Sequence, residues 1–122
     1  MAVRSRSGQL KLFPFVETFQ ENSRCLWVKG PLPTTPELRR LGNKILKFLQ
    51  AIDYVGAMGF ELFDQGRKGI LVNELAPRVH NSGHYSLDAL EENQFSAHVK
   101  AVLGMELTEP KLRGVDKARP AT

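Results

Sequence analysis

The sequence has only one cysteine and no long hydrophobic run. Cys25 cannot form a disulfide within the chain, so nothing indicates an oxidising compartment, and the cytoplasm is the expected location. No stretch approaches the roughly 18 apolar residues of a membrane span, and the opening segment MAVRSRSGQ lacks the apolar centre of a signal peptide. These absences predict a soluble, cytoplasmic protein with no membrane partner.

The chain also lacks a glycine-rich phosphate loop and any cluster of basic residues interleaved with aromatic ones. Its net charge of +4 is spread thinly, so it favours anionic ligands in general and does not predict nucleic-acid binding. The rest of the composition is ordinary for a globular protein. With 122 residues, of which 42% are hydrophobic and 25% charged, the chain suits one domain with a modest core.

Three segments rich in strand-forming residues lie before the proline-rich loop PLPTTP. Residues 2–6 and 9–16 flank Ser7 and Gly8, a pair that suits a tight turn, and residues 25–30 read CLWVKG. We therefore expect two paired strands at the start of the chain and a further strand before the loop.

Two segments have apolar residues at helical spacing. The first runs from Pro36 to residue 52, with Thr35 placed to cap it. The second covers residues 87–103, stops before Gly104, and places these apolar side chains on one face: Leu90, Phe95, Val99, Val102 and Leu103. Together with the strands, these segments predict an α+β fold in which a mostly antiparallel sheet carries two packed helices.

Residues 55–64 and 70–75 predict a β-hairpin, because the intervening QGRKG is turn-like. A turn over residues 66–69 gives a register with these pairs: Gln65 with Ile70, Phe63 with Val72, and Glu61 with Glu74. Like charges directly opposite each other are destabilising. Either the register slips by one residue, or both carboxylates point to water, or a cation lies between them.

A cation at this pair would be Mg²⁺, which usually takes one or two carboxylates together with phosphate oxygens. Glu61 and Glu74 are the candidate metal ligands, and the Asn73 amide could complete the oxygen shell. The sequence alone leaves this reading open beside the slipped or solvated hairpin.

Polar side chains crowd the segment NELAPRVHNSGH, residues 73–84. Arg78, His80 and Asn81 offer a planar guanidinium, an imidazole and an amide that could hold a carboxylate, bicarbonate or phosphate. Ser82 and His84 are close in sequence. Each residue taken alone also suits a plain loop, as a turn former, a surface charge or a backbone-bonded imidazole. Zinc at the two histidines is not expected, because the residues between them disfavour a single helix face.

The segments NELAPRVHNSGHYS and NQFSAHVKAVLGMEL resemble the C-terminal part of the N5-carboxyaminoimidazole ribonucleotide synthetase family, ATP-grasp ligases of purine biosynthesis. The similarity extends back through YVGAMGFELF and FPFVE, over residues 2–107. A related phosphoribosylglycinamide formyltransferase family differs where this chain has Asn81 and Ser82. The resemblance implies that residues 1–107 form the C-terminal lobe of an ATP-grasp domain and that residues 108–122 are a polar tail, extended or disordered.

This resemblance also implies a chemistry and a set of partners. Family members carboxylate 5-aminoimidazole ribonucleotide with ATP and bicarbonate, and they form homodimers. By similarity, Glu61, Asn73 and Glu74 would contact ATP, the two glutamates through Mg²⁺. Arg78 and His80, with the neighbouring Asn81, would lie near bicarbonate or carboxyphosphate and the ribonucleotide.

The family's enzymes are much longer than this sequence and carry an N-terminal half that it does not contain. One hypothesis is therefore a fragment of a carboxylating ligase that is inactive alone and that a complementing N-terminal chain could restore. The alternative is a non-catalytic module that binds a nucleotide, a metal or a protein partner through the same surface.

Overall fold

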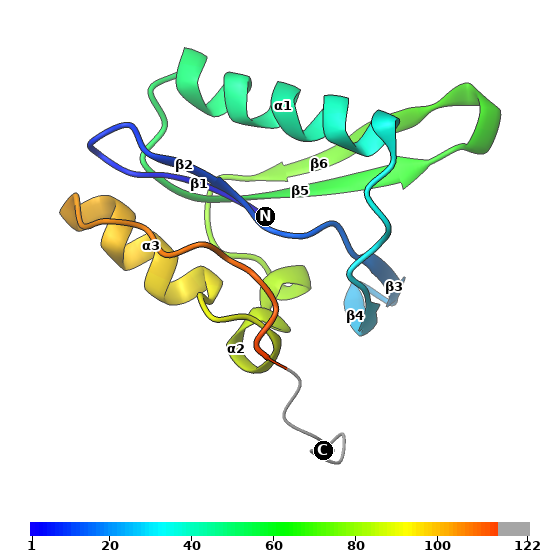
Figure 1. The fold of residues 1–122 in the computed structure, drawn as a ribbon. Helices are drawn as coiled ribbons and strands as arrows, with labels where there is room; N and C mark the ends of the chain where they lie inside the picture. Colours follow the sequence, from blue (N-terminus) through cyan, green and yellow to red (C-terminus); the bar gives the residue numbers. More distant parts are fainter. Residues whose placement is uncertain (115–122) are drawn as a thin grey trace.

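The sheet of this protein has four strands in the order β2-β1-β5-β6, and all three pairings are antiparallel. Its strands are β1 (Ala2–Arg4), β2 (Leu10–Leu12), β5 (Gly56–Asp64) and β6 (Ile70–Ala76). The structure is a computed structural model and describes residues 1–114. Figure 1 shows one long helix above this sheet and a shorter one below it. The expected α+β fold with a mostly antiparallel sheet is confirmed.

Helices cover both faces of the sheet because neighbouring strand residues point to opposite sides. Helix α1 (Pro36–Ala51) lies on one face and α3 (Gln94–Leu103) on the other. The α1 face buries the cluster Ala2, Ile45, Leu49 and Met58. The α3 face buries the cluster Val3, Phe13, Ala57, Leu90, Ala97, Ala101 and Leu107. One pair of central strands therefore supplies side chains to two separate cores.

Helix α1 begins and ends close to where the sequence predicts. The Thr35 hydroxyl accepts a hydrogen bond from the Leu38 backbone N–H at 3.2 Å, and Pro36 occupies the first turn. Midway along the helix, Gly42 faces the sheet so closely that a Cβ there would lie 2.6 Å from Leu12 Cδ2. The missing side chain is what allows the helix to approach the sheet.

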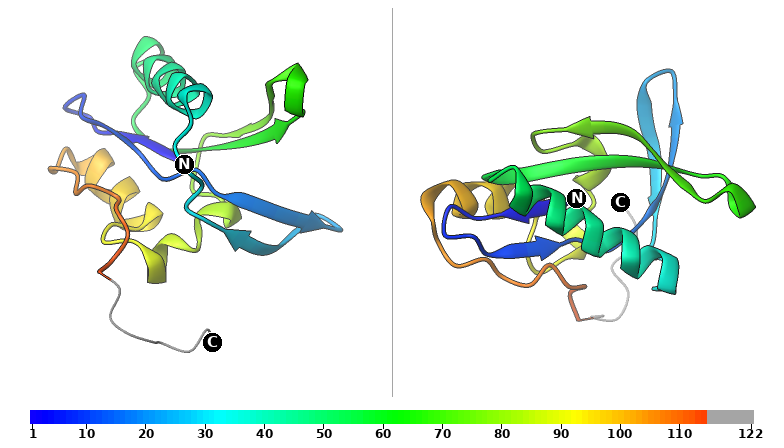
Figure 2. Two further views of the ribbon diagram at one scale, coloured as in Figure 1. Left: turned by 45° about the vertical axis from the view of Figure 1, so that its right-hand side comes forward. Right: turned by 90° about the horizontal axis from the view of Figure 1, so that it is seen from above.

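A second, two-stranded sheet was not foreseen. Strands β3 (Glu17–Glu21) and β4 (Arg24–Lys29) form a hairpin whose turn residues, Asn22 and Ser23, both have positive φ. The predicted strand 9–16 is too long, since β2 stops at Leu12 and the chain re-forms a strand only at β3. Asn-Ser is a weaker hairpin signal than the usual Asn-Gly, so the sequence did not predict this turn. In the left view of Figure 2 this hairpin and the tip of β5–β6 both point to the right, whereas the view from above shows that they point in different directions.

The expected single helix over residues 87–103 is wrong. The structure has a short helix α2 (Ser86–Ala89) and then α3, which Asn93 caps by accepting from the backbone N–H groups of Phe95 and Ser96. The buried face of α3 carries Gln94, Ala97 and Ala101. Most of the large apolar side chains assigned to the core face are exposed instead: Phe95, Val99, Val102 and Leu103. Small residues face the sheet because α3 packs close against β5 and β1.

After α3 the chain runs back past the end of α2. Gly104 ends the helix with a left-handed backbone, as predicted, and Leu107 is buried. Residues 108–114 then run extended, with a bridge between Leu90 and Leu112 and a hydrogen bond from the Arg113 N–H to the Ala89 carbonyl. The remainder of the expected tail, residues 115–122, lies outside the described residues. Within residues 1–114, no helix is long and apolar enough to cross a membrane.

Candidate functional site

The hairpin β5–β6 places Glu61 directly opposite Glu74. This pairing, predicted from the position of the turn, holds toward the base of the hairpin, where Phe60 faces Leu75. Toward the tip the predicted register is wrong by one residue, because Phe63 pairs with Leu71 rather than Val72. The shift occurs at a β-bulge beside Glu61, in which Asn73 is the extra residue of β6.

The bulge brings three oxygen-bearing side chains to one place on the hairpin. The Asn73 Nδ2 group lies 3.4 Å from Glu61 Oε2, a long hydrogen bond. Glu74 is half exposed, with 52% of its side chain accessible, whereas Glu61 is partly buried. The register therefore keeps the two glutamates opposite each other, and the Asn73 amide contacts one of them, Glu61.

The side chains of Glu61, Asn73 and Glu74 suit a hard cation that also binds ligands from outside the protein. Carboxylate and amide oxygens suit Mg²⁺, and Asn73 can present its carbonyl oxygen once its amide is turned. In the part of the chain that the structure describes, no group of three or more His, Cys, Asp or Glu side chains could hold a metal ion. Two carboxylates and one amide would leave further coordination positions of a Mg²⁺ ion to other ligands.

His80, in the turn after β6, lies beside one member of the carboxylate pair, Glu74. Its Nε2 atom lies 4.0 Å from Glu74 Oε1, and only 12% of its side chain is accessible. Its Nδ1 atom accepts a hydrogen bond from the Ser82 backbone N–H at 3.3 Å and lies 2.7 Å from the Ser82 hydroxyl. Because Nδ1 is an acceptor, the neutral ring carries its proton on Nε2, the atom that faces Glu74.

The other polar residues of this segment do not join that cluster. The Arg78 guanidinium is exposed and donates to the Val79 carbonyl at 2.9 Å. Asn81 is exposed at the start of a 3₁₀ turn, η2 (Asn81–Gly83). The His84 ring stacks on Phe95 with a centroid separation of 5.5 Å, so the two histidines of the zinc hypothesis have different neighbours. Of the three predicted anion-site residues, His80 is therefore the one that lies next to a site carboxylate, that of Glu74, and its ring also contacts Ser82.

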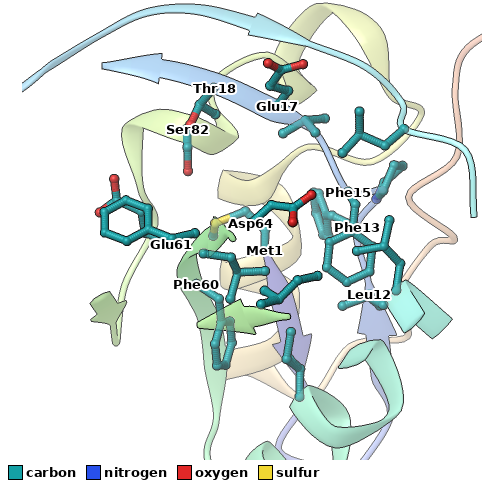
Figure 3. A pocket seen from close by; sticks show the side chains of 18 of the residues that line it. Met1, Leu12, Phe13, Phe15, Glu17, Thr18, Phe60, Glu61, Asp64 and Ser82 are labelled. Atoms are coloured by element: carbon teal, nitrogen blue, oxygen red, sulfur yellow. The ribbon is translucent and has the colours of Figure 1, made fainter. Parts of the chain in front are cut away.

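A cavity of about 860 Å³ opens beside Glu61, between the β5–β6 hairpin, strand β3 and helix α1. Figure 3 shows Glu61 and Ser82 on one side of it and the apolar side chains Leu12, Phe13 and Phe15 on the other. Strand β3 contributes Glu17, Thr18 and Gln20, which the sequence did not suggest because the strand itself was missed. The volume lies in the range of small-molecule and cofactor sites.

Two titratable groups are perturbed here: Tyr85, which lines the cavity, and Cys25, which senses the charge of Glu61. Burial raises the pKa of Tyr85 to about 12, and its hydroxyl donates to the Pro14 carbonyl at 3.3 Å. Burial, followed by the negative charge of Glu61, raises the pKa of the Cys25 thiol. Both groups therefore stay neutral near pH 7, and the formal charge at this end of the cavity comes from carboxylates.

Comparison with known proteins gives the family to which this fold belongs. A sequence model of the ATP-grasp domain matches residues 1–95, so the chain belongs to the ATP-grasp family. Within that family it is similar to the N5-carboxyaminoimidazole ribonucleotide synthase of Synechococcus elongatus, with 43% identity over 114 residues. It is also 39% identical over 108 residues to the phosphoribosylaminoimidazole carboxylase of Candida albicans. These alignments cover 93% and 88% of this chain.

Solved structures agree. The N5-carboxyaminoimidazole ribonucleotide synthetase of Thermus thermophilus superposes with a TM-score of 0.84 at 36% identity over 93% of this chain. The Aspergillus clavatus enzyme in complex with ADP and 5-aminoimidazole ribonucleotide gives 0.79 at 29% identity over 92%. The predicted resemblance is confirmed. The chain spans only 29% of the Synechococcus protein and 32% of the Thermus chain.

Proposed function

We propose that this chain forms the Mg²⁺- and anion-binding part of an ATP-dependent ligase that carboxylates 5-aminoimidazole ribonucleotide. In that reaction a bicarbonate oxygen attacks the γ-phosphorus of ATP and ADP leaves, which gives carboxyphosphate. The exocyclic amine of the ribonucleotide then attacks the carboxyl carbon, and phosphate leaves. The similarity to synthases named for this product over 93% of the chain supports the proposal.

The observation that carries the proposal is the Glu61–Glu74 pair with Asn73 in the bulge beside it. A like-charged pair on facing strands costs free energy unless a cation or a proton offsets it. Glu61, Asn73 and Glu74 would hold Mg²⁺, and a bound Mg²⁺ would supply positive charge to the phosphate oxygens of ATP. The site residues then offset their own repulsion through the ligand that they bind.

The anion side of the site rests on three residues of the following turn. His80 keeps its Nε2 proton facing the carboxylates, where it can donate to an oxygen of bicarbonate or carboxyphosphate. Arg78 and Asn81 are exposed near it in sequence, free to orient toward an anion that enters from solvent. Their assignment as substrate-contacting residues is carried over from the family motif.

The proposal makes a direct prediction about nucleotide binding. We expect Mg²⁺-dependent binding of ADP to the purified chain in calorimetry, and we expect Glu61→Gln and Glu74→Gln each to weaken it by at least about tenfold, since a charge-assisted contact contributes about 1.5–3 kcal/mol. Glu106→Gln is the matched control, because it removes one exposed carboxylate outside the hairpin. Equal affinity for wild type and all three variants would remove the glutamate pair from the site.

Activity is predicted to need more protein than these residues. Since the chain spans about a third of its relatives, we expect no ATP hydrolysis stimulated by 5-aminoimidazole ribonucleotide from the purified chain alone. We expect a complementing N-terminal chain to restore it. Turnover by the isolated chain, at a rate that survives repeated purification, would contradict this expectation.

A second candidate function is favoured by the exposed apolar side chains at the hairpin tip, Phe63, Leu71 and Val72. A non-catalytic ATP-grasp remnant would use this surface to bind a protein partner. The calorimetric experiment separates the candidates, because a pure interaction module does not require Mg²⁺ or the two glutamates for its binding.

A further inference from the structure

The turn that carries His80 is held by one buried side chain of a different element. Gln94, the first residue of α3, is fully buried. Its Oε1 atom accepts from the His80 backbone N–H at 3.0 Å, and its Nε2 atom donates to the His80 carbonyl at 2.8 Å. The oxygen and the nitrogen of one side-chain amide thus both bond the backbone of a single residue. A shorter or apolar side chain cannot reproduce this arrangement.

Ser86 and Gly83 connect Gln94 to the turn. Its backbone N–H donates to the Ser86 hydroxyl at 3.0 Å, and that hydroxyl donates to the Gly83 carbonyl. Gly83 cannot carry a side chain, because a Cβ there would lie 2.4 Å from Gln94 Oε1. The start of α3 and the 3₁₀ turn η2 are therefore joined by buried polar bonds whose loss would leave unsatisfied groups.

The position of the His80 ring follows from its backbone. Gly59 on β5 leaves room for it, since a Cβ at Gly59 would lie 2.9 Å from His80 Cβ. With the backbone held by Gln94 and the ring seated over Gly59, Nδ1 reaches Ser82 and Nε2 faces Glu74. A rotation of the His80 backbone would break this geometry while leaving the sheet intact.

We propose that Gln94 is a positioning residue for the site, which clamps the His80 backbone so that the imidazole faces Glu74. The relevance of this position to catalysis rests on the proposed function. The test of the position itself does not. Gln94 contacts neither the carboxylates nor the cavity. It acts only through His80, by denying that residue alternative backbone and χ1 conformations.

The test uses the ligand-free chain in solution. In wild type, NMR should detect through-hydrogen-bond couplings between the His80 amide nitrogen and Gln94 Cδ, and between Gln94 Nε2 and the His80 carbonyl carbon. Three-bond couplings should report a single χ1 rotamer for His80. Absence of both amide couplings, or rotamer averaging at His80 in wild type, would overturn the proposal without any variant being made.

Gln94→Met keeps the length of the side chain and removes both bonds. We expect averaged χ1 couplings at His80 and at least about tenfold faster amide hydrogen exchange there, the scale set by one lost hydrogen bond. Asn93→Ala is the matched control, because it removes the cap of the same helix without touching His80. A purely structural role for Gln94 would lower the melting temperature in both variants and leave the His80 rotamer unchanged in both.

Ligand binding by wild type and variants tests separately whether Gln94 matters for the proposed function. If wild type binds Mg²⁺ and ADP, Gln94→Met should lose at least about tenfold in affinity and Asn93→Ala should not. Failure of wild type to bind contradicts the proposed function and leaves the rotamer test standing. Binding by wild type with a native His80 rotamer in Gln94→Met contradicts the positioning role alone.

Discussion

The base and the tip of the β5–β6 hairpin are built from similar residues but have different surroundings. At the base, Ala57 and Met58 are buried between α1 and α3. At the tip, the side chains of Phe63, Leu71 and Val72 are about half exposed. The bulge at Asn73 marks the change from one region to the other. Apolar sequence therefore reports strand formation in both halves, whereas burial depends on which other elements reach them.

The site residues lie at this boundary, and that location has a physical reason. A metal site needs carboxylates on rigid strands, and it also needs access for a ligand. The closed base of the hairpin supplies rigidity, because β1 pairs with β5 and both helices pack there. The uncovered tip leaves the cavity side of Glu61 open. The following predictions extend this contrast to other buried and exposed positions of the molecule.

The largest effect is expected in the closed core. Leu49→Ala removes a side chain that is 0% exposed on α1, and it should lower the free energy of unfolding by about 3 kcal/mol through lost burial and a cavity. Val72→Ala at the tip, where the side chain is 52% exposed, should cost less than about 0.5 kcal/mol. Urea unfolding of both variants measures the contrast. Equal losses would mean that the tip is covered in solution.

Glu92, a buried carboxylate outside the site, should contribute to the free energy of unfolding in a pH-dependent way. Glu92 is buried and accepts from Lys100 and Ser96. Burial alone would raise its pKa, but the hydrogen bonds from Lys100 and Ser96, the charge of Lys100 and a backbone bond at Thr108 lower it. Its stabilisation is therefore present above the unfolded carboxyl pKa and is lost as the pH falls through the folded value.

Glu92→Gln should lower the free energy of unfolding at neutral pH by about 2 kcal/mol, the scale of hydrogen bonds to a charged group. The difference from wild type should shrink as the pH is lowered through the acid range, as followed by urea unfolding at a series of pH values. The neighbouring Glu91, which is exposed and lies 3.8 Å from Lys111, is the control. Glu91→Gln should stay within about 0.5 kcal/mol of wild type throughout. A constant difference for Glu92→Gln across the acid range would contradict the shift.

The smallest effect should have the opposite sign. Without metal, Glu74→Gln removes a like-charge pair on facing strands and should raise the free energy of unfolding by about 0.5 kcal/mol. With Mg²⁺ and ADP present, the order should reverse, because only wild type gains the binding free energy. Thermal unfolding with and without the ligands measures both signs. A variant less stable than wild type in the absence of metal would show that Glu74 has a structural partner instead.

Much of the fold was accessible from the pattern of residues. Thr35, Pro36 and the apolar spacing that follows predicted α1, and QGRKG predicted the β5–β6 turn. The β3–β4 hairpin was missed because its turn, Asn22 and Ser23, lacks the glycine that usually permits positive φ. The second helix was wrongly drawn through Asn93, because the apolar residues on either side of this cap fit one helical period.

The site was accessible to a lesser degree. The turn position gave Glu61 opposite Glu74 correctly, even though the outer half of the register was wrong. Had the bulge been on the other side of Glu61, the same reasoning would have paired the wrong residues. Gln94 gave no signal at all, because its importance lies in two bonds to His80, which is 14 residues away in the chain.

By itself the sequence determined the local elements, the family and the residue types that the site contains. Capping, turn chemistry and apolar periodicity act within a few residues, so they can be recognised from the sequence. Tertiary structure alone decided which apolar faces are buried, where the bulge falls, and how the His80 ring is aimed at Glu74. These depend on contacts between segments distant in sequence, such as α3 against β5 and Gln94 against His80. The polar stretch of residues 73–84 supplied the chemical groups, and packing selected which of them meet.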